Sequence, residues 1–354
     1  MTQYIALDVH CAFIEMAVVD GRGRVVRRER IATTIPGIEM LLEAIPRPRW
    51  LTFEEGPMSG WLYRHLRNLV DKLVVCDARR NRLVSKDSDK DDPIDAEKLA
   101  LLLRGGFLKE VHQAESLERA IFKQHVGLYH DSVRGRVRMA NMILAQFRRF
   151  GIFSSEREML DAEQRAALLR RLPCQGLLRE DIETLWRTYV AHWEQEDQMR
   201  ERLVQQARRE PMIRQFVEVP GIAWIRAATF FAYVDTPWRF SSKQALWKYA
   251  GIGLERSHSG AGPTQVHVAQ YANRRLRGVL LGAAKTVIGK RDSPFYDQYK
   301  DWTQEKGILA GNARRNVARS LAATLWGMWK NGREYRPQLV GPGGEMADKL
   351  ASVT

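Results

Sequence analysis

Hydrophobic and polar residues alternate along the first part of the chain. The alternation covers three runs, Tyr4–His10, Phe13–Asp20 and Val25–Ala32, and a Gly21–Gly23 turn joins the second run to the third. Because successive side chains of a strand point to opposite faces, this alternation predicts strands with one buried face. Tight turns between consecutive strands predict that the three form an antiparallel meander.

Predicted helices and strands then alternate along the chain. A helix is expected around Ile38–Ala44, a strand at Trp50–Glu54, a helix at about Gly60–Val70, a strand at Leu73–Asp77 and a helix over Pro93–Leu103. The order βββαβαβα predicts a mixed sheet with helices packed on it. This is the order of the RNase H-like fold, which RuvC-like nucleases and transposases use.

The middle of the chain is helical and densely charged. Helices are predicted over Ser116–Phe150, Glu156–Arg171 and Leu178–Arg209, and Pro211 ends the last of them. Long charged helices between two domains are typical of a coiled-coil-like arm or an oligomerisation element. A plain helical bundle packed on itself explains the pattern equally well.

The expected fold is therefore α/β plus α. We expect an RNase H-like domain at residues 1–110, a helical arm at 111–210, a mostly helical domain at 211–340 and a flexible tail at 341–354. No apolar run approaches the roughly 18 residues of a membrane span, and the first residues lack the pattern of a signal peptide. The three cysteines are scattered and fit neither a disulfide framework nor a zinc site, which favours a reducing cytoplasm.

Positive charge is concentrated in the last part of the chain. Of a net charge of +14, residues 211–354 contribute +11, with 21 Lys and Arg against 10 Asp and Glu. Such an excess attracts phosphate through counterion release and long-range steering. A basic but inert surface would carry the same charge, so charge alone does not establish nucleic acid binding.

Acidic residues stand at the ends of two predicted strands and at the start of a helix. Asp8 is the centre of an apolar LDV run, and Glu54 and Glu55 end the Trp50 strand. Asp92 and Asp95 open a helix, and their i, i+3 spacing puts them on one helical face.

Each acid has an ordinary explanation when it is taken singly. Asp92 before Pro93 is a good helix cap, Asp95 favours the helix dipole, and Glu55 can be a solvated strand end. Together, two strand-end acids and two helix acids can converge at one edge of an RNase H-like sheet. Their oxygen ligands suit Mg²⁺, and two such ions can polarise a phosphodiester.

The C-terminal region contains further elements that suit a phosphate backbone. Residues 216–234 resemble a helix–hairpin–helix with Pro220, Gly221 and Ile222 as the hairpin, a weak signal by itself. Glycines around Ser257 and Ser259 predict an irregular loop that lets a DNA backbone approach closely.

A serine in such a loop is usually a turn residue. As a nucleophile it would need a base or a cation for activation and an electropositive cradle for phosphate. Neighbouring arginines could form the cradle: Asn273 and Arg277 share a helical face, and Arg314, Arg315 and Arg319 make another basic set. The sequence identifies no base.

The motifs ALD, FEEG, KDDPIDAEKLA, VPGI, RFSSKQALWKYAGI, SG and ANRRLR occur in this order between about residues 4 and 330. They resemble the insertion-sequence transposases with a DEDD, RuvC-like domain, described as bridge-RNA-guided serine recombinases. The last block is the most specific, because YAG, SG and N-x-x-LR recur there at fixed intervals. Two departures stand out. Glu55 follows Glu54 where the family has a small residue, and Ala272 replaces the glycine before Asn273.

The resemblance implies a set of site residues, cofactors and partners. The acids binding one or two Mg²⁺ ions would be Asp8, Glu54, Asp92 and Asp95, with Glu55 as an alternative to Glu54. Ser259 would be the nucleophile that links covalently to DNA. Nucleic acid contacts are expected at Arg256, Asn273, Arg274, Arg277, Arg314 and Arg315.

The implied partners are target DNA, donor DNA, a structured bridge RNA and further copies of the chain in a dimer or tetramer. Its place of action would be the bacterial cytoplasm, at the nucleoid, without a membrane.

The sequence thus predicts a magnesium-dependent DNA recombinase or transposase. One alternative is a metal-dependent, structure-specific nuclease like a junction resolvase, in which Ser259 is structural. Another is a non-catalytic nucleic-acid-binding scaffold whose acids only cap helices. A trapped protein–DNA adduct would separate recombinase from nuclease, and metal-dependent cleavage that is lost in Asp8→Asn would exclude the scaffold.

Overall fold

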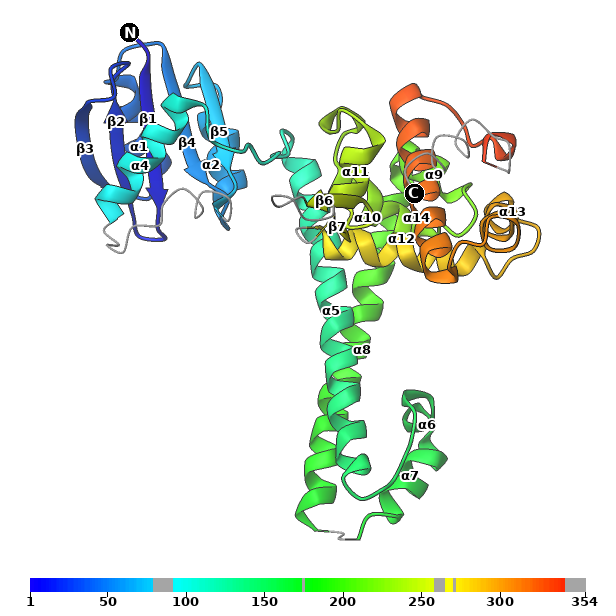
Figure 1. Ribbon diagram of the computed structural model, residues 1–354. Helices are drawn as coiled ribbons and strands as arrows, with labels where there is room; N and C mark the ends of the chain where they lie inside the picture. Colours follow the sequence, from blue (N-terminus) through cyan, green and yellow to red (C-terminus); the bar gives the residue numbers. More distant parts are fainter. Residues whose placement is uncertain (79–91, 174–175, 258–264, 270–271, 341–354) are drawn as a thin grey trace. The chain divides into compact units, whose positions relative to one another are not determined.

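The computed structural model describes residues 1–78, 92–173, 176–257, 265–269 and 272–340 (Figure 1). The chain folds as two compact units, Met1–Ala120 and Ile121–Thr354. None of the described helices is long and apolar enough to cross a bilayer. The predicted tail at 341–354 lies outside the described residues.

The first unit is built on a mixed sheet. Its five strands lie in the order β3-β2-β1-β4-β5; they are β1 (Gln3–Val9), β2 (Phe13–Val19), β3 (Val25–Ala32), β4 (Arg49–Glu54) and β5 (Lys72–Cys76). β1, β2 and β3 form an antiparallel meander, whereas β4 runs parallel to β1 and β5 parallel to β4. The meander and the mixed sheet predicted from the alternation are confirmed.

Helices cover both faces of this sheet. α1 (Ile35–Glu43) and α2 (Ser59–Leu66) pack on one face, in a core that includes Ile5, Leu7 and Phe53. α4 (Asp92–Gly105) packs on the other face, where Leu99, Ala100 and Leu103 meet Ala6, Val74 and Cys76. The side chains of one strand therefore alternate between two cores, as period-two alternation requires.

α4 runs in the opposite direction to β1. Near its C-terminal end, Arg104 Nε donates a hydrogen bond of 3.1 Å to the carbonyl of Gly21. Gly21 lies just beyond the end of β2, whose Val19 pairs with Tyr4 at the start of β1. The first residue of α4, Asp92, therefore lies toward the far end of β1, where Asp8 is found.

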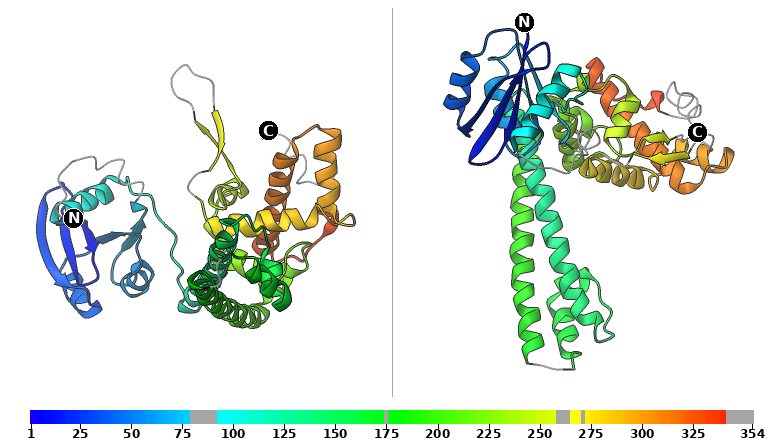
Figure 2. Two further views of the ribbon diagram at one scale, coloured as in Figure 1. Left: turned by 90° about the horizontal axis from the view of Figure 1, so that it is seen from below. Right: turned by 60° about the vertical axis from the view of Figure 1, so that its left-hand side comes forward.

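The second unit contains an arm of two long helices that run side by side (Figures 1 and 2). They are α5 (Leu117–Arg148) and α8 (Leu177–Arg209), as the sequence predicts. Arg136 of α5 forms ion pairs with Glu196 of α8 and with Glu156, and the Tyr189 hydroxyl donates a 2.8 Å hydrogen bond to Glu156. This network ties the two helices to Glu156, the first residue of α6 (Glu156–Leu160).

The tip departs from the prediction of one helix over 156–171. It holds two helices, α6 (Glu156–Leu160) and α7 (Ala162–Arg170), because Asp161 between them is extended. Its carboxylate accepts the N–H of Gln164 at 2.9 Å and so caps α7. The helical spacing of hydrophobic residues continues across Asp161, which is why the pattern alone predicts a single helix.

The remaining helices surround α10 (Trp224–Val234), which is buried from Ala227 onward. They are α9 (Pro211–Val217), η1 (Pro237–Arg239), α11 (Lys243–Tyr249), α12 (Arg274–Val287), α13 (Pro294–Lys300), η2 (Asp301–Glu305), α14 (Ala310–Asn331) and η3 (Pro337–Leu339). The base of the arm joins their core through Val126, Tyr129 and Leu203. The arm and the C-terminal helices thus share one hydrophobic core.

An antiparallel hairpin interrupts the helices. β6 (Leu254–Ser257) pairs with β7 (Gln265–Val268), and the left view of Figure 2 shows the two strands standing out from the helices. The sequence predicts only an irregular glycine-rich loop here. Ser259 lies in the 258–264 segment, outside the described residues.

Candidate metal centre and nucleic-acid interface

Asp8 and Glu54 occupy neighbouring positions at the ends of two parallel strands. β1 and β4 pair in register up to Leu7 and Phe53, and each acid directly follows this last pair. Glu54 also pairs with Cys76 of β5, which belongs to the core beneath α4. By strand alternation both acids lie on the face that α4 covers. Glu55, one residue further, has the opposite parity, which favours Glu54 over Glu55.

The row of side chains continues across the sheet from Asp8. Asp8 pairs with Glu15 of β2, which pairs with Arg30 of β3. Glu15 is 6% exposed, and its carboxylate forms an ion pair with the Arg30 guanidinium. The guanidinium also lies 4.4 Å from the centre of the Phe13 ring. Glu15 therefore already has a strong intramolecular partner in Arg30.

His10 fixes one oxygen of Asp8. Its Nε2 lies 3.1 Å from Asp8 Oδ2, and because a carboxylate only accepts, the imidazole nitrogen donates. The imidazole stacks on the Phe13 ring, with centres 4.6 Å apart. The Asp8 side chain remains 31% exposed. A held but accessible carboxylate at a strand end is suited to bind a cation.

The helix acids are placed only in part. Asp92 is the first residue of α4, but its side chain lies outside the described residues; Asp95 is exposed. Among the side chains that the structure describes, no three His, Cys, Asp or Glu gather closely enough to hold a metal ion. The convergence of all four acids therefore stays a prediction. The donor set fits Mg²⁺, because it offers carboxylate oxygens at one end of one sheet face.

The glycines before the Ser259 segment have a local cause that differs from the one expected. Gly251 has a φ of +67° and follows the last turn of α11, a position that favours glycine. A Cβ on Gly253 would lie 2.7 Å from the backbone N of Lys248. Close approach of DNA is not needed to explain either glycine, so they do not support Ser259 as the nucleophile.

Arg319 holds the start of the hairpin on α14. Its side chain is buried; Nε donates a 2.7 Å hydrogen bond to the Ile252 carbonyl, and Nη1 donates to Asn316 at 2.8 Å. The Trp247 indole N–H donates to the Arg319 carbonyl at 3.0 Å. Burial, with the nearby Arg315, lowers the pKa of Arg319 to about 10. Arg319 is thus an internal support, although its spacing places it among surface arginines.

Known proteins match both units. A transposase family model, that of the DEDD transposases of IS110, matches residues 5–151. A second model, the transposase IS116/IS110/IS902 family, matches residues 214–300. The chain belongs to the IS110/IS116 family of transposases.

Two known proteins are similar in sequence to this transposase. The transposase is 22% identical over 319 residues to y4qE of Sinorhizobium fredii, which carries the name of a transposase; the match covers 80% of this chain and 76% of the relative. It is 29% identical over 119 residues to an insertion element IS116 protein of Streptomyces clavuligerus, which covers 34% of this chain and 29% of that protein. Family membership makes the chain an enzyme that cuts and rejoins DNA.

The predicted nucleic-acid contacts of the transposase differ in their surroundings. Asn273 caps α12: its Oδ1 accepts the Leu276 N–H at 2.9 Å, and its Nδ2 donates to the Tyr249 hydroxyl at 3.2 Å. Arg274, Arg277 and Arg314 are exposed, and Arg315 donates to Asn312 at 3.1 Å. The side chain of Arg256 lies outside the described residues. Among the predicted contacts whose side chains the structure describes, the exposed cations are therefore Arg274, Arg277 and Arg314.

Sequence reasoning missed a set of cations stacked on aromatic rings of the transposase. The Arg239 guanidinium lies 4.3 Å from the centre of the Tyr249 ring. The Lys330 ammonium lies 4.6 Å from the Trp326 ring and 5.4 Å from the Trp238 ring. A signal existed in the Pro-Trp-Arg-Phe run at 237–240, which places a tryptophan and an arginine in a polar turn.

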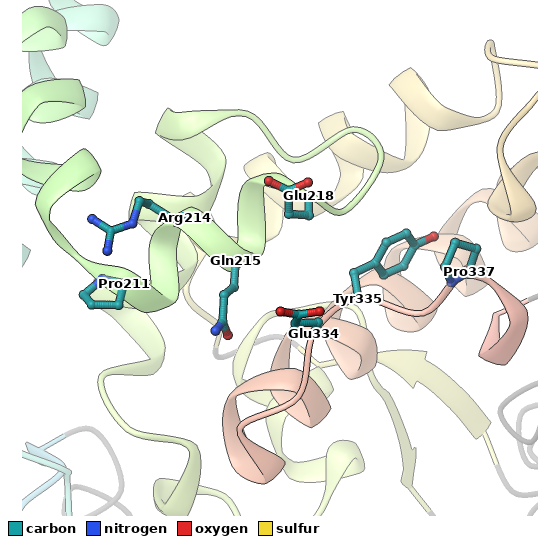
Figure 3. A pocket seen from close by; sticks show the side chains of 7 residues that line it. All are labelled: Pro211, Arg214, Gln215, Glu218, Glu334, Tyr335 and Pro337. Carbon is teal, nitrogen blue, oxygen red and sulfur yellow. The ribbon is translucent and has the colours of Figure 1, made fainter.

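A cleft of about 600 Å³ lies elsewhere in the transposase, between α9 and the segment after α14 (Figure 3). Its walls carry both signs of charge, since Arg214, Glu218 and Glu334 all line it. No residue of the predicted DNA chemistry lines it. A cleft with two carboxylates is poorly suited to a phosphate backbone.

Proposed function

We propose that the transposase is a magnesium-dependent recombinase whose first unit is an RNase H-like domain. Mg²⁺ would be held by Asp8, Glu54, Asp92 and Asp95. The observation that carries the proposal is the register of Asp8 and Glu54 on the face covered by α4, with α4 beginning at that end of the sheet.

The helical repeat supports the inclusion of Asp92. Leu99 and Leu103 of α4 belong to the core against the sheet, and Ala96 is fully buried. Leu103, Leu99 and Ala96 are spaced four and three residues apart, so position 92, four before Ala96, continues this buried line toward the strand ends. Asp95, exposed beside the line, would complete the ligand set from the flank of the helix.

The protein groups at this site would orient the ligand atoms. His10 holds one oxygen of Asp8, as hydrogen-bonded supports of metal ligands do. Glu15 is neutralised by Arg30 and is left out of the set. Mg²⁺ held by these acids would supply positive charge that stabilises the phosphodiester and its leaving oxygen.

We further propose Ser259 as the nucleophile. Its Oγ would form a bond to phosphorus while the bond from phosphorus to one deoxyribose oxygen breaks, and the serine proton would pass to that leaving oxygen. Attack by the hydroxyl of another DNA end on the phosphoserine reverses these bond changes and rejoins DNA without hydrolysis. The support is the family resemblance of the Ser-Gly segment and the firm attachment of its hairpin through Arg319.

A structured bridge RNA that pairs with donor and target DNA completes the proposal, together with a dimeric or tetrameric assembly. Exposed Arg274, Arg277 and Arg314 support nucleic acid binding by the second unit. On the arm, Leu128 and Trp193 are 46% and 48% exposed, which supports a contact between copies there.

Incubation of purified transposase, with its copurified RNA, on donor and target DNA tests the chemistry. Wild-type protein should give a covalent protein–DNA adduct that survives denaturation, and strand-exchanged product. Ser259→Ala should lose both, whereas the matched Ser257→Ala should keep both within a few-fold. Cleavage without any adduct, unchanged in Ser259→Ala, would favour the nuclease instead.

A further inference from the structure

One tryptophan of the second unit stands out by its exposure. Trp238 is 70% exposed, although indole is among the costliest side chains to leave in water. Among the described residues after Pro211, the other exposed large apolar side chains are Leu309 and Leu339. Neither belongs to η1 or to the last turns of α14. Trp238 is therefore a single aromatic platform and not part of a wide apolar patch.

The backbone that presents Trp238 is strained and firmly held. Asp235 has φ +67° and ψ −51°, and the Thr236 N–H donates to the Val234 carbonyl at 2.9 Å. These values describe the rare γ-turn with positive φ, which persists only where surrounding structure enforces it. The Trp326 indole N–H enforces it by donating to the Pro237 carbonyl at 2.8 Å. Strain of this kind is typical of functional segments.

Cations border the platform. The Lys330 ammonium lies near both the Trp326 and Trp238 rings, and Arg239 stacks on Tyr249. Tyr249 in turn accepts a hydrogen bond from Asn273, next to exposed Arg274. An aromatic face followed by cations matches the alternation of bases and phosphates along an unpaired strand.

We infer that Trp238 stacks on an unpaired base of single-stranded nucleic acid, with Lys330 beside the neighbouring phosphate. The inference rests on the proposed nucleic-acid function and adds a site for unpaired strand. A protein partner would need apolar surface around the indole to build a buried hot spot, and the described surroundings offer cations instead. Lys330 remains able to contact phosphate, because cation–π contact leaves part of an ammonium in water.

Binding of labelled dT10, rU10 and a 10-base-pair duplex to the full-length protein, freed of RNA, tests the inference by fluorescence anisotropy. Trp238→Ala should weaken binding of the single strands about 10-fold, and Trp238→Phe by less than about 3-fold. Lys330→Gln should lower the salt dependence for single strands by about one counterion. Duplex affinity should stay unchanged. Equal losses for dT10 and rU10 would show that the stacked base can come from either nucleic acid, and a larger loss for one would name the source.

Phe153→Ala removes a 78% exposed aromatic side chain between α5 and α6; it is the matched control and should leave all three affinities unchanged. Unfolding temperatures should agree among the variants, because neither side chain is buried. Three outcomes overturn the inference. Wild-type protein does not bind single strands, Trp238→Ala binds them as wild type does, or Trp238→Ala changes the oligomeric state instead of strand binding. Ser259→Ala should bind as wild type, so failure of the serine chemistry is distinguishable from failure of this site.

Discussion

The strand-end acids of the first unit and the buried arginines of the second use charge in different ways, although Arg49 of the first unit is also buried. In the first, carboxylates stand at the ends of strands, where Asp8 keeps 31% of its side chain exposed. In the second, arginines enter the interior: Arg319 is 5% exposed, and burial lowers the pKa of Arg226, which donates to the Gly221 carbonyl at 2.6 Å. Part of the positive charge counted in the sequence is therefore structural and not available to DNA.

This difference separates two uses of charge. A carboxylate at a strand end costs little in stability without a metal, and its removal should affect chemistry more than folding. An arginine that donates to a buried carbonyl fixes a segment, and its removal should affect folding first. Variants of strand-end carboxylates and of buried arginines test whether the first affect chemistry and the second affect folding.

The largest effect is expected for Asp8→Asn. Asparagine keeps the shape of the side chain but lacks the negative charge that a cation needs, so magnesium-dependent DNA cleavage should fall at least about 100-fold. The thermal unfolding temperature without metal should stay close to wild type. Cleavage at a near-normal rate would falsify the metal site and leave Asp8 as a strand-end residue.

The next prediction compares two adjacent glutamates. Glu54→Gln should lower cleavage about as strongly as Asp8→Asn, because strand parity puts Glu54 on the face of α4. Glu55→Gln should change the rate less than about 3-fold. Single-turnover cleavage at saturating Mg²⁺ measures both. A larger loss of cleavage in Glu55→Gln than in Glu54→Gln would show that strand alternation breaks at the end of β4 and that Glu55 is the ligand.

Arginines of α14 offer a matched pair for the other half of the comparison. Arg319→Met should lower the free energy of unfolding by about 1.5–3 kcal/mol, since it removes charged hydrogen bonds to Ile252 and Asn316. Arg314→Met should change that free energy by less than about 0.5 kcal/mol, yet weaken DNA binding in a salt-dependent way. Urea denaturation and DNA titration measure the two. Similar stability losses in both variants would contradict the distinction between a structural Arg319 and a surface Arg314.

Local patterns predict much of the first unit. The strands of the meander follow from period-two alternation, and the antiparallel pairing follows from the short turns between them. The choice between Glu54 and Glu55 does not follow, because it depends on which residue of β1 each one faces. Register is a property of two strands, and a run of adjacent glutamates in one strand carries no information on it.

The second unit is harder to predict because its decisive contacts are distant in sequence. Helical spacing puts Arg319 with Arg314 and Arg315, but the Ile252 carbonyl that Arg319 binds lies 67 residues away. The four-residue strands β6 and β7 are too short to show alternation. Gly253 is explained by the backbone of α11, which no spacing rule reveals.

The smallest predicted effect concerns the joint between the arm and the C-terminal helices. His130 Nε2 lies 2.9 Å from the Thr229 hydroxyl, which itself donates to the Ile225 carbonyl, so the imidazole nitrogen is the donor. Burial, together with the nearby Arg275, lowers the pKa of His130 to about 4. An interior that already holds arginines therefore resists a further positive charge.

The pH dependence follows from this lowered pKa. Between about pH 6.5 and 4 the unfolded chain binds a proton at residue 130 that the folded chain does not, so folded stability falls as the pH falls. From pH 7 to pH 5 His130 should contribute a loss of at most about 2 kcal/mol. His130→Gln can still donate to Thr229 and should lose less stability than wild type over this interval, as measured by urea denaturation at both pH values. Thr229→Val is the control: it removes the acceptor but leaves the imidazole buried, so it should be less stable at pH 7 and keep the wild-type slope. Parallel curves for wild type and His130→Gln would show that the folded protein tolerates protonation of His130. Burial beside Arg275 would then not hold the imidazole neutral.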